Sequence, residues 1–226
     1  GVLKLSSSFE HVSPDSVGNI RRFLTSEMAG GTAILKKVNA VFPELTKDSP
    51  EMAGIMKALK EQEHIGYQYE GADSSFELLV RKKIGKYRPF FELINYKIIS
   101  GRPSEPGCSA SATVKVRVGD KVQLMAAEGN GPVNALDKAL RSALEVFYPC
   151  LSSAHLIDYK VRVLDGKDAT AARVRVLITS TDGRNIWTTV GVSGDVVEAS
   201  WLALVDSVEY LFLKNALASM LFLRSS

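Results

Sequence analysis

Two stretches in the second half of the chain alternate hydrophobic and polar residues with the period of a β-strand, and a helical pattern follows each of them. Within residues 112–118 the apolar side chains are Val114, Val116 and Val118, the alternation of a half-buried strand. The helical pattern after it has apolar residues at 136, 140, 143, 144 and 147, so one face of that helix is buried. The full prediction is strands at 90–100, 112–118 and 122–127 with a helix at 133–147, then strands at 155–164, 173–179 and 186–190 with a helix at 195–214.

The two stretches are copies of one unit. Tyr96 in the sequence LINYKI and Tyr159 in LIDYKV are 63 residues apart, and Gly131 and Gly194 have the same offset. The helices that follow match with an offset of 64, as Ala135 does with Ala199. A nearly constant offset across separate landmarks indicates an internal duplication. We therefore expect an α+β fold in which a small helical linker region (1–86) precedes a duplicated β-β-β-α domain (87–226), with repeats at about 87–150 and 151–226.

The helix expected at 195–214 is apolar over most of its surface, so it needs a second surface to pack against, such as its twin or another subunit. A duplicated unit also creates a seam between its copies, and seams of this kind often hold small ligands. The alternative is that the duplication only makes a stable scaffold that binds nothing.

The first 86 residues have a different texture, with short helices joined by turns. Ser49-Pro50 is a helix start with a capping hydroxyl, and Ser74 with Glu77 fits a capping box. This part has too few apolar residues for an independent core, so we expect it to dock onto something larger.

Composition excludes several classes of protein. The 226 residues are 46% hydrophobic and 23% charged, which is typical of a globular protein. A net charge of +3, without a basic stripe, argues against a nucleic-acid partner. Acidic and basic residues interrupt the apolar stretch 201–223, so we expect no membrane segment. Two isolated cysteines, Cys108 and Cys150, and no signal peptide indicate a cytoplasmic setting, and a start without Met suggests a piece of a longer protein.

The sequence Gly129-Asn130-Gly131-Pro132-Val133 lies where a strand gives way to a helix. It lacks the G-K-[ST] of a P-loop and the third glycine of a dinucleotide fingerprint. The three histidines are far apart, so no zinc motif exists, and no serine or cysteine nucleophile motif is present. A helix N-terminus can nevertheless hold a carboxylate. With apolar residues around it, this arrangement suits a branched-chain amino acid.

Several long motifs resemble a known family: AAEGNGPVNALDKAL, LIDYKVRVLDGKDATAARVRVLI and VGVSGDVVEASWLALVDSVEY. They look like the C-terminal regulatory region shared by citramalate synthase and 2-isopropylmalate synthase. FEHVSPDSVGN and GYQYEGADSSFELLVRK are most similar to the citramalate synthase branch. The resemblance implies that the whole enzyme condenses acetyl-CoA with pyruvate, in isoleucine biosynthesis, at a divalent metal in an N-terminal (β/α)8 barrel. No barrel sequence is present, so this chain would hold no metal and be inactive alone.

The resemblance also implies a homodimer that binds isoleucine as a feedback inhibitor, or leucine in the 2-isopropylmalate synthase branch. Carried over motif by motif, the effector-binding residues are Gly129, Gly131, Pro132, Val133, Leu156, Asp158, Tyr159 and Val163. Tyr159 is equally consistent with a plain core aromatic residue.

The linking segment of such enzymes reaches toward the partner's active site, which makes Glu10, His11 and Arg21 candidates for catalysis in trans. The chain departs from the family pattern at Gly31, where relatives have an arginine within Ala-Gly-Arg-Ser-Asn. The departure puts an active-site role of that loop in doubt.

Overall fold

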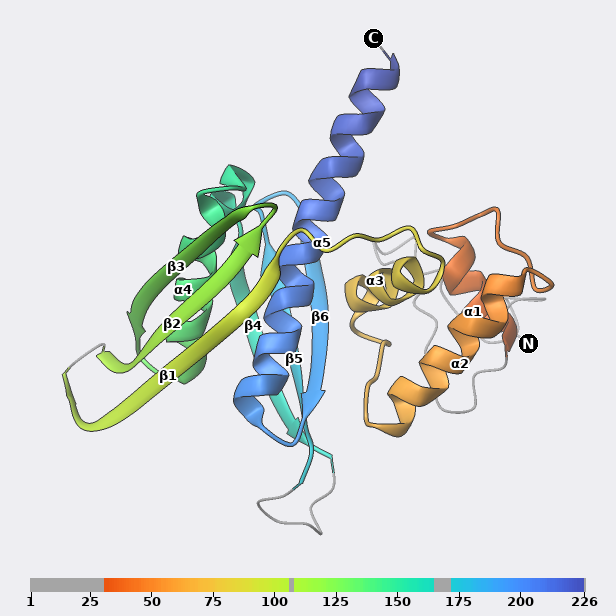
Figure 1. Cartoon of the computed structure of the whole chain (residues 1–226). Helices are drawn as coiled ribbons and strands as arrows, with labels where there is room; N and C mark the ends of the chain where they lie inside the picture. Colours follow the sequence, from red (N-terminus) through yellow and green to blue (C-terminus); the bar gives the residue numbers. More distant parts are fainter. Residues whose placement is uncertain (1–30, 106–107, 165–171, 226) are drawn as a thin grey trace, which may run out of the picture.

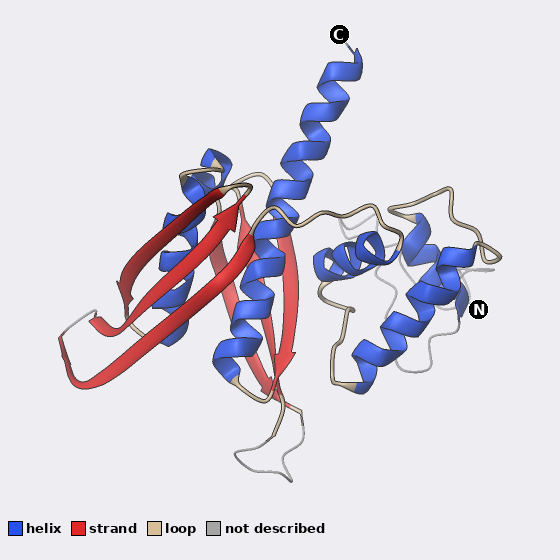
Figure 2. Cartoon of the chain, viewed as in Figure 1, coloured by secondary structure: helices blue, strands red, loops and turns tan. Residues whose placement is uncertain are grey.

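A computed structural model describes residues 31–105, 108–164 and 172–225 (Figure 1). Three helices come first, and two β-β-β-α units follow (Figure 2). The α+β class and the duplicated order predicted from the sequence are therefore confirmed. The elements are α1 (Gly31–Asn39), α2 (Pro50–His64), α3 (Asp73–Lys83), β1 (Glu92–Glu105), β2 (Cys108–Val118), β3 (Lys121–Gly129), α4 (Pro132–Glu145), the 3-10 helix η3 (Pro149–Ser153), β4 (His155–Val163), β5 (Val174–Thr181), β6 (Ile186–Ser193) and α5 (Val196–Ser225).

Each repeat forms its own antiparallel sheet of three strands. Sheet A has the order β1-β2-β3, and sheet B has the order β4-β5-β6. Helix α4 packs on β2 and β3, and α5 packs on β5 and β6. One hydrophobic core joins both repeats, with Val114 of sheet A and Ile178 of sheet B both fully buried. Arg141 of α4 strengthens the joint, because it donates to the carbonyl of Ala154 just before β4 at 2.7 Å.

Two elements, β1 and α5, continue furthest past their predicted C-terminal ends. Strand β1 continues past residue 100, where the prediction ended, to Glu105, and it includes Gly101 and Pro103. The strand pairs only with β2, and an edge strand tolerates proline because its outer N–H groups have no ladder partner. Helix α5 continues past Lys214 to Ser225, and its C-terminal end projects away from the rest of the chain (Figure 1). No glycine or proline interrupts the sequence over these last turns.

The helical region docks on the outer face of sheet B, beside β6 (Figure 1). It has a hydrophobic cluster of its own, which Val190 and Val192 of β6 complete. Arg175 of β5 adds polar contacts, since its Nε donates to the carbonyl of Gly66 at 2.7 Å and its Nη1 to Gln68 Oε1 at 2.5 Å. The buried apolar residues that α1–α3 and their loops contribute are Ile34, Val38, Phe42, Leu45, Met52, Ile55, Leu59, Tyr69, Ala72, Phe76 and Val80.

The predicted start of α2 at Ser49-Pro50 is confirmed, but neither of the two predicted side-chain caps forms. Ser49 is the N-cap residue of α2, but its side chain makes no capping hydrogen bond and instead accepts from the backbone N–H of Thr46 at 2.9 Å. Ser74 lies inside α3, whose N-cap residue is Ala72. Glu77 pairs with Arg81 one turn further along α3 and with Lys214 of α5, at 2.8 and 3.0 Å, so these ion pairs take the carboxylate that the capping box required.

None of the helices in the described parts of the chain is both long and apolar enough to cross a membrane.

Candidate functional site

Residues 129–133, which we call the lip, connect the end of β3 with the start of α4. Gly129 is buried, and a Cβ there would lie 2.5 Å from the backbone N of Ala135, so only glycine fits. Gly131 has open space around it and an extended backbone with φ of −174°, so its glycine is not required by sterics. It is the N-cap residue of α4 but supplies no side-chain cap. The first N–H groups of α4 therefore lack acceptors within the helix.

A small open hollow adjoins the lip. Its volume is about 300 Å³, and Ser100, Gly101, Ser109 and Pro132 line it. The Ser109 hydroxyl donates to the carbonyl of Asn130, which fastens the lip to β2. Ser100 and Ser109 were not predicted as site residues. The predicted strand ended at residue 100, so nothing in the sequence indicated that the far end of β1 lies beside α4. The hollow has the size of a small-molecule site and hydroxyl groups on its wall.

The second predicted group lies on β4, in sheet B. Tyr159 and Val163 are 39% and 55% exposed, and Val161 between them is 45% exposed. These side chains pair in register with Ile178, Val174 and Val176 of β5, on the face that α5 covers further along the sheet. Leu156 packs against the main core. Three neighbouring apolar side chains on an edge strand form an exposed surface, which we call the β4 face.

Asp158 lies on the opposite side of the same strand and pairs with Lys160. The hydrogen bond from Lys160 lowers the pKa of the Asp158 carboxyl below its usual value. An ionised Asp158 would repel a carboxylate ligand, so its predicted role is better suited to a ligand ammonium.

The two tyrosines that mark the duplication both reach the first turns of α5. The Tyr159 hydroxyl lies 2.8 Å from Ser200 Oγ, and the Tyr96 hydroxyl donates to Glu198 Oε2 at 2.8 Å. Burial, and then the hydrogen bond to Glu198, raises the pKa of Tyr96 to about 12. The alternative that Tyr159 is a plain core aromatic residue does not hold, because its side chain is partly exposed and its hydroxyl is hydrogen-bonded to Ser200.

The lip belongs to sheet A and the β4 face to sheet B. The structure thus divides the predicted residues into two groups: Gly129, Gly131, Pro132 and Val133 at the start of α4, and Leu156, Asp158, Tyr159 and Val163 on β4.

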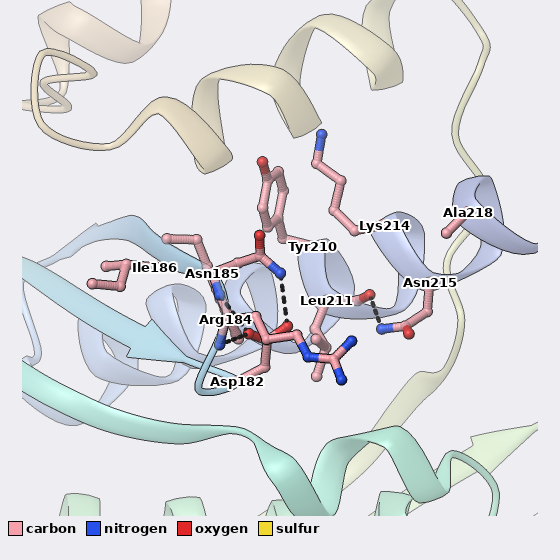
Figure 3. Close-up of a pocket in the computed structure, with 10 residues that line it drawn as sticks. Asp182, Arg184, Asn185, Ile186, Tyr210, Leu211, Lys214, Asn215 and Ala218 are labelled. Atoms are coloured by element: carbon pink, nitrogen blue, oxygen red, sulfur yellow. Dashed lines mark hydrogen bonds between the residues drawn. The ribbon is translucent and has the colours of Figure 1, made fainter. Parts of the chain in front are cut away.

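A larger hollow of about 630 Å³ lies elsewhere, between the β5–β6 turn and the C-terminal half of α5 (Figure 3). Asp182 closes the turn by accepting from the backbone N–H groups of Arg184 and Asn185 at 2.9 and 2.6 Å. Lys214 on the helix wall pairs with Glu77 of α3. Asp182 and Lys214 thus both have partners, and none of the predicted effector residues lines the hollow.

The candidates for catalysis in trans, Glu10, His11 and Arg21, lie outside the described residues. Gly31, where the family pattern is broken, is the first residue of α1. Within residues 31–105, 108–164 and 172–225, no three histidine, cysteine or acidic side chains are grouped so as to hold a metal ion.

Comparison with known proteins identifies the family. The family model described as the LeuA allosteric (dimerisation) domain matches residues 70–212. The chain is 47% identical over 209 residues to the (R)-citramalate synthase of Geobacter sulfurreducens, and 42% identical over 215 residues to that of Aquifex aeolicus. It is 28% identical over 215 residues to the probable 2-isopropylmalate synthase of Methanopyrus kandleri.

These matches cover 92%, 95% and 93% of the chain, but only 40%, 41% and 40% of the three relatives. The chain thus spans about two fifths of the length of the curated relatives it matches. The resemblance to the C-terminal region of citramalate synthase is confirmed, and the chain belongs to the family of the LeuA allosteric (dimerisation) domain.

Proposed function

We propose that this chain is the regulatory part of an (R)-citramalate synthase. The observation that carries the proposal is the 47% identity to a protein of that name across 92% of the chain, against 28% to a probable 2-isopropylmalate synthase. The whole protein would then condense acetyl-CoA with pyruvate, in the cytoplasm, at a metal held by a barrel domain outside this sequence. This chain alone would bind an effector without catalysing the reaction.

The effector that fits this function is isoleucine, the end product of the pathway. Its carboxylate would accept hydrogen bonds from the free N–H groups at the start of α4, where the helix dipole also favours a negative charge. Its branched side chain would lie on apolar surface, and the β4 face offers Tyr159, Val161 and Val163.

The proposed assembly is a homodimer. The matching family is described as a dimerisation domain, and the β4 face leaves three large apolar side chains exposed on an edge strand. An open strand edge with an apolar flank is a surface that a second chain can cover. A second copy would thereby enclose an effector that a single chain leaves open to water.

The match to a probable 2-isopropylmalate synthase supports a second candidate, a leucine-binding regulatory domain. Leucine and isoleucine differ only in the position of one methyl branch. A hydrophobic pocket discriminates such isomers weakly, so their relative affinities must be measured and cannot be read from the residue types.

Substitution of Tyr159 tests where the effector lies. Tyr159→Ala removes the ring from the β4 face, and we expect isoleucine affinity to fall at least roughly tenfold, the equivalent of about 1.4 kcal/mol. Tyr159→Phe is the matched control, because it keeps the ring and loses only the contact with Ser200. Calorimetric titration of both variants measures the affinities. If Tyr159→Ala binds isoleucine as tightly as the parent chain, the proposed location is wrong.

A further inference from the structure

A single hydroxyl joins three elements at the junction between the helical region and the repeats. Ser75 on α3 donates to Asp206 Oδ2 of α5 at 2.7 Å and accepts from the backbone N–H of Val190 at 3.0 Å. Val190 belongs to β6, the edge strand of sheet B, so this N–H points away from the sheet. Helix α3 therefore closes the sheet edge and contacts α5 through the same side chain.

One turn further along α5, Glu209 holds the segment that connects α3 to β1. Its side chain is only 2% exposed. It accepts from the backbone N–H of Phe90 at 3.1 and 3.3 Å, and it is hydrogen-bonded to the side chain of Tyr87. Asp206 and Glu209, three positions apart on α5, thus form hydrogen bonds that hold α3 and the segment between α3 and β1 in place.

Few positive charges compensate these carboxyl groups. Lys82 of α3 lies 3.4 Å from Asp206 and acts on both carboxyls. The other cations near this junction, Arg81 and Lys214, pair with Glu77. The remaining titratable groups that face the pair are phenols, whose pKa values are raised chiefly by burial, with a smaller contribution from Asp206 or Glu209: Tyr67, Tyr69, Tyr87 and Tyr148.

The environment therefore favours a neutral carboxyl. Burial raises the pKa of Glu209 to about 7, and the nearby Asp206 contributes in the same direction. Burial also raises the pKa of Asp206, against the attraction of Lys82. Of the two carboxyls, Glu209 is the one whose neutral form the junction favours near neutral pH.

We propose that the junction of α3, the connecting segment and α5 is a proton-linked latch. With Glu209 protonated, the helical region stays docked on α5 and β6. When Glu209 loses its proton, its buried negative charge adds to that of the partly buried Asp206 with Lys82 as their cation, and the docking of α3 and the connecting segment weakens. The latch lies between the two β-β-β-α repeats and the helical region that precedes them in the chain.

The sign and size of the effect follow from proton linkage. A carboxyl whose pKa is higher in the docked state binds its proton more tightly there, so docking is strongest below the ordinary value of 4.5 and weakens as pH rises through about 7. If undocking returns Glu209 to its ordinary pKa, the docking equilibrium falls roughly tenfold between pH 6 and pH 8. Amide hydrogen exchange measures this equilibrium residue by residue.

The experiment follows exchange of the α3 amides and of the Phe90 amide in the whole chain at pH 6, 7 and 8, corrected for the intrinsic pH dependence of exchange. We expect their protection to fall roughly tenfold over this range while amides in the middle of β2 change little. Glu209→Gln keeps the shape and cannot titrate, so its change should stay below roughly twofold. Glu51→Gln, an exposed position on α2, is the control and should behave like the parent chain.

A flat response in the parent chain, or an equal response in Glu209→Gln, overturns the proposal. If Glu209→Gln does not fold, Asp206→Asn decides instead, because removing the neighbouring charge should move the transition to lower pH. An unchanged transition in Asp206→Asn also overturns it. The experiment contains no amino-acid ligand, so its outcome is independent of the effector proposal.

Discussion

Gly129 and Gly131 of the lip allow a sharp test, because the same substitution meets opposite surroundings only two residues apart. A Cβ on Gly129 would lie 2.5 Å from the backbone N and 2.9 Å from the Cα of Ala135. Both atoms belong to the first turn of α4, which cannot step aside without moving the helix. A Cβ on Gly131 meets no atom within 4 Å.

The expected costs differ accordingly. Inserting a methyl group into a filled site costs about 1–3 kcal/mol, so Gly129→Ala should destabilise the fold by that amount. For a domain of this size each kcal/mol lowers the melting temperature by about 2–4 °C, which gives a decrease of roughly 2–12 °C. Gly131→Ala should cost less than about 1 kcal/mol, since alanine is only a poorer N-cap residue than glycine.

Thermal unfolding measures the stability, and calorimetric titration with isoleucine measures binding. Because Gly129→Ala displaces the N–H groups at the start of α4, it should weaken isoleucine binding beyond what Gly131→Ala does. Equal melting temperatures for the two variants would refute the packing argument. Equal affinities in two folded variants would refute the role of the helix N-terminus.

Two further predictions concern the surfaces on either side of sheet B. Ser75→Ala leaves the Val190 N–H and the Asp206 carboxyl without this partner, so we expect the free energy of unfolding, measured in urea, to fall by about 1–3 kcal/mol. Ser74 makes neither contact, so Ser74→Ala should cost less. Equal costs would contradict the bridging role of Ser75. Val161→Lys places a charge on the β4 face and should raise the dimer dissociation constant, measured by light scattering, roughly tenfold or more. Ile186→Lys, at an exposed position on β6, should leave that constant unchanged. A dimer unaffected by Val161→Lys would show that the β4 face is not the interface.

The duplication made the domain of two repeats predictable from the sequence. Strand alternation and the offset between Tyr96 and Tyr159 identified both units, and the registers of β1 and β4 agree with that offset. The ends of elements were less predictable. Gly101 and Pro103 indicate a turn by propensity, yet β1 continues because its outer edge needs no N–H donor.

Tertiary contacts explain the other differences. Glu77 has the spacing of a capping box with Ser74, but its carboxylate instead pairs with Arg81 of α3 and with Lys214 of α5. In the sequence, Glu209 is one of the charged residues that interrupt the apolar stretch 201–223, and the sequence does not tell which of these charges become buried. The register between β1 and β2 places the hydroxyls of Ser100 and Ser109 beside the lip, and register is a non-local property that local sequence patterns do not predict.

The most direct test of the central claim is calorimetric titration of this chain with isoleucine, leucine and valine after its dimer state has been established. We predict saturable binding of isoleucine with clearly higher affinity than leucine or valine. A preference for leucine would assign the domain to the 2-isopropylmalate synthase branch. A folded dimer that binds none of the three would contradict the regulatory function and leave a scaffold.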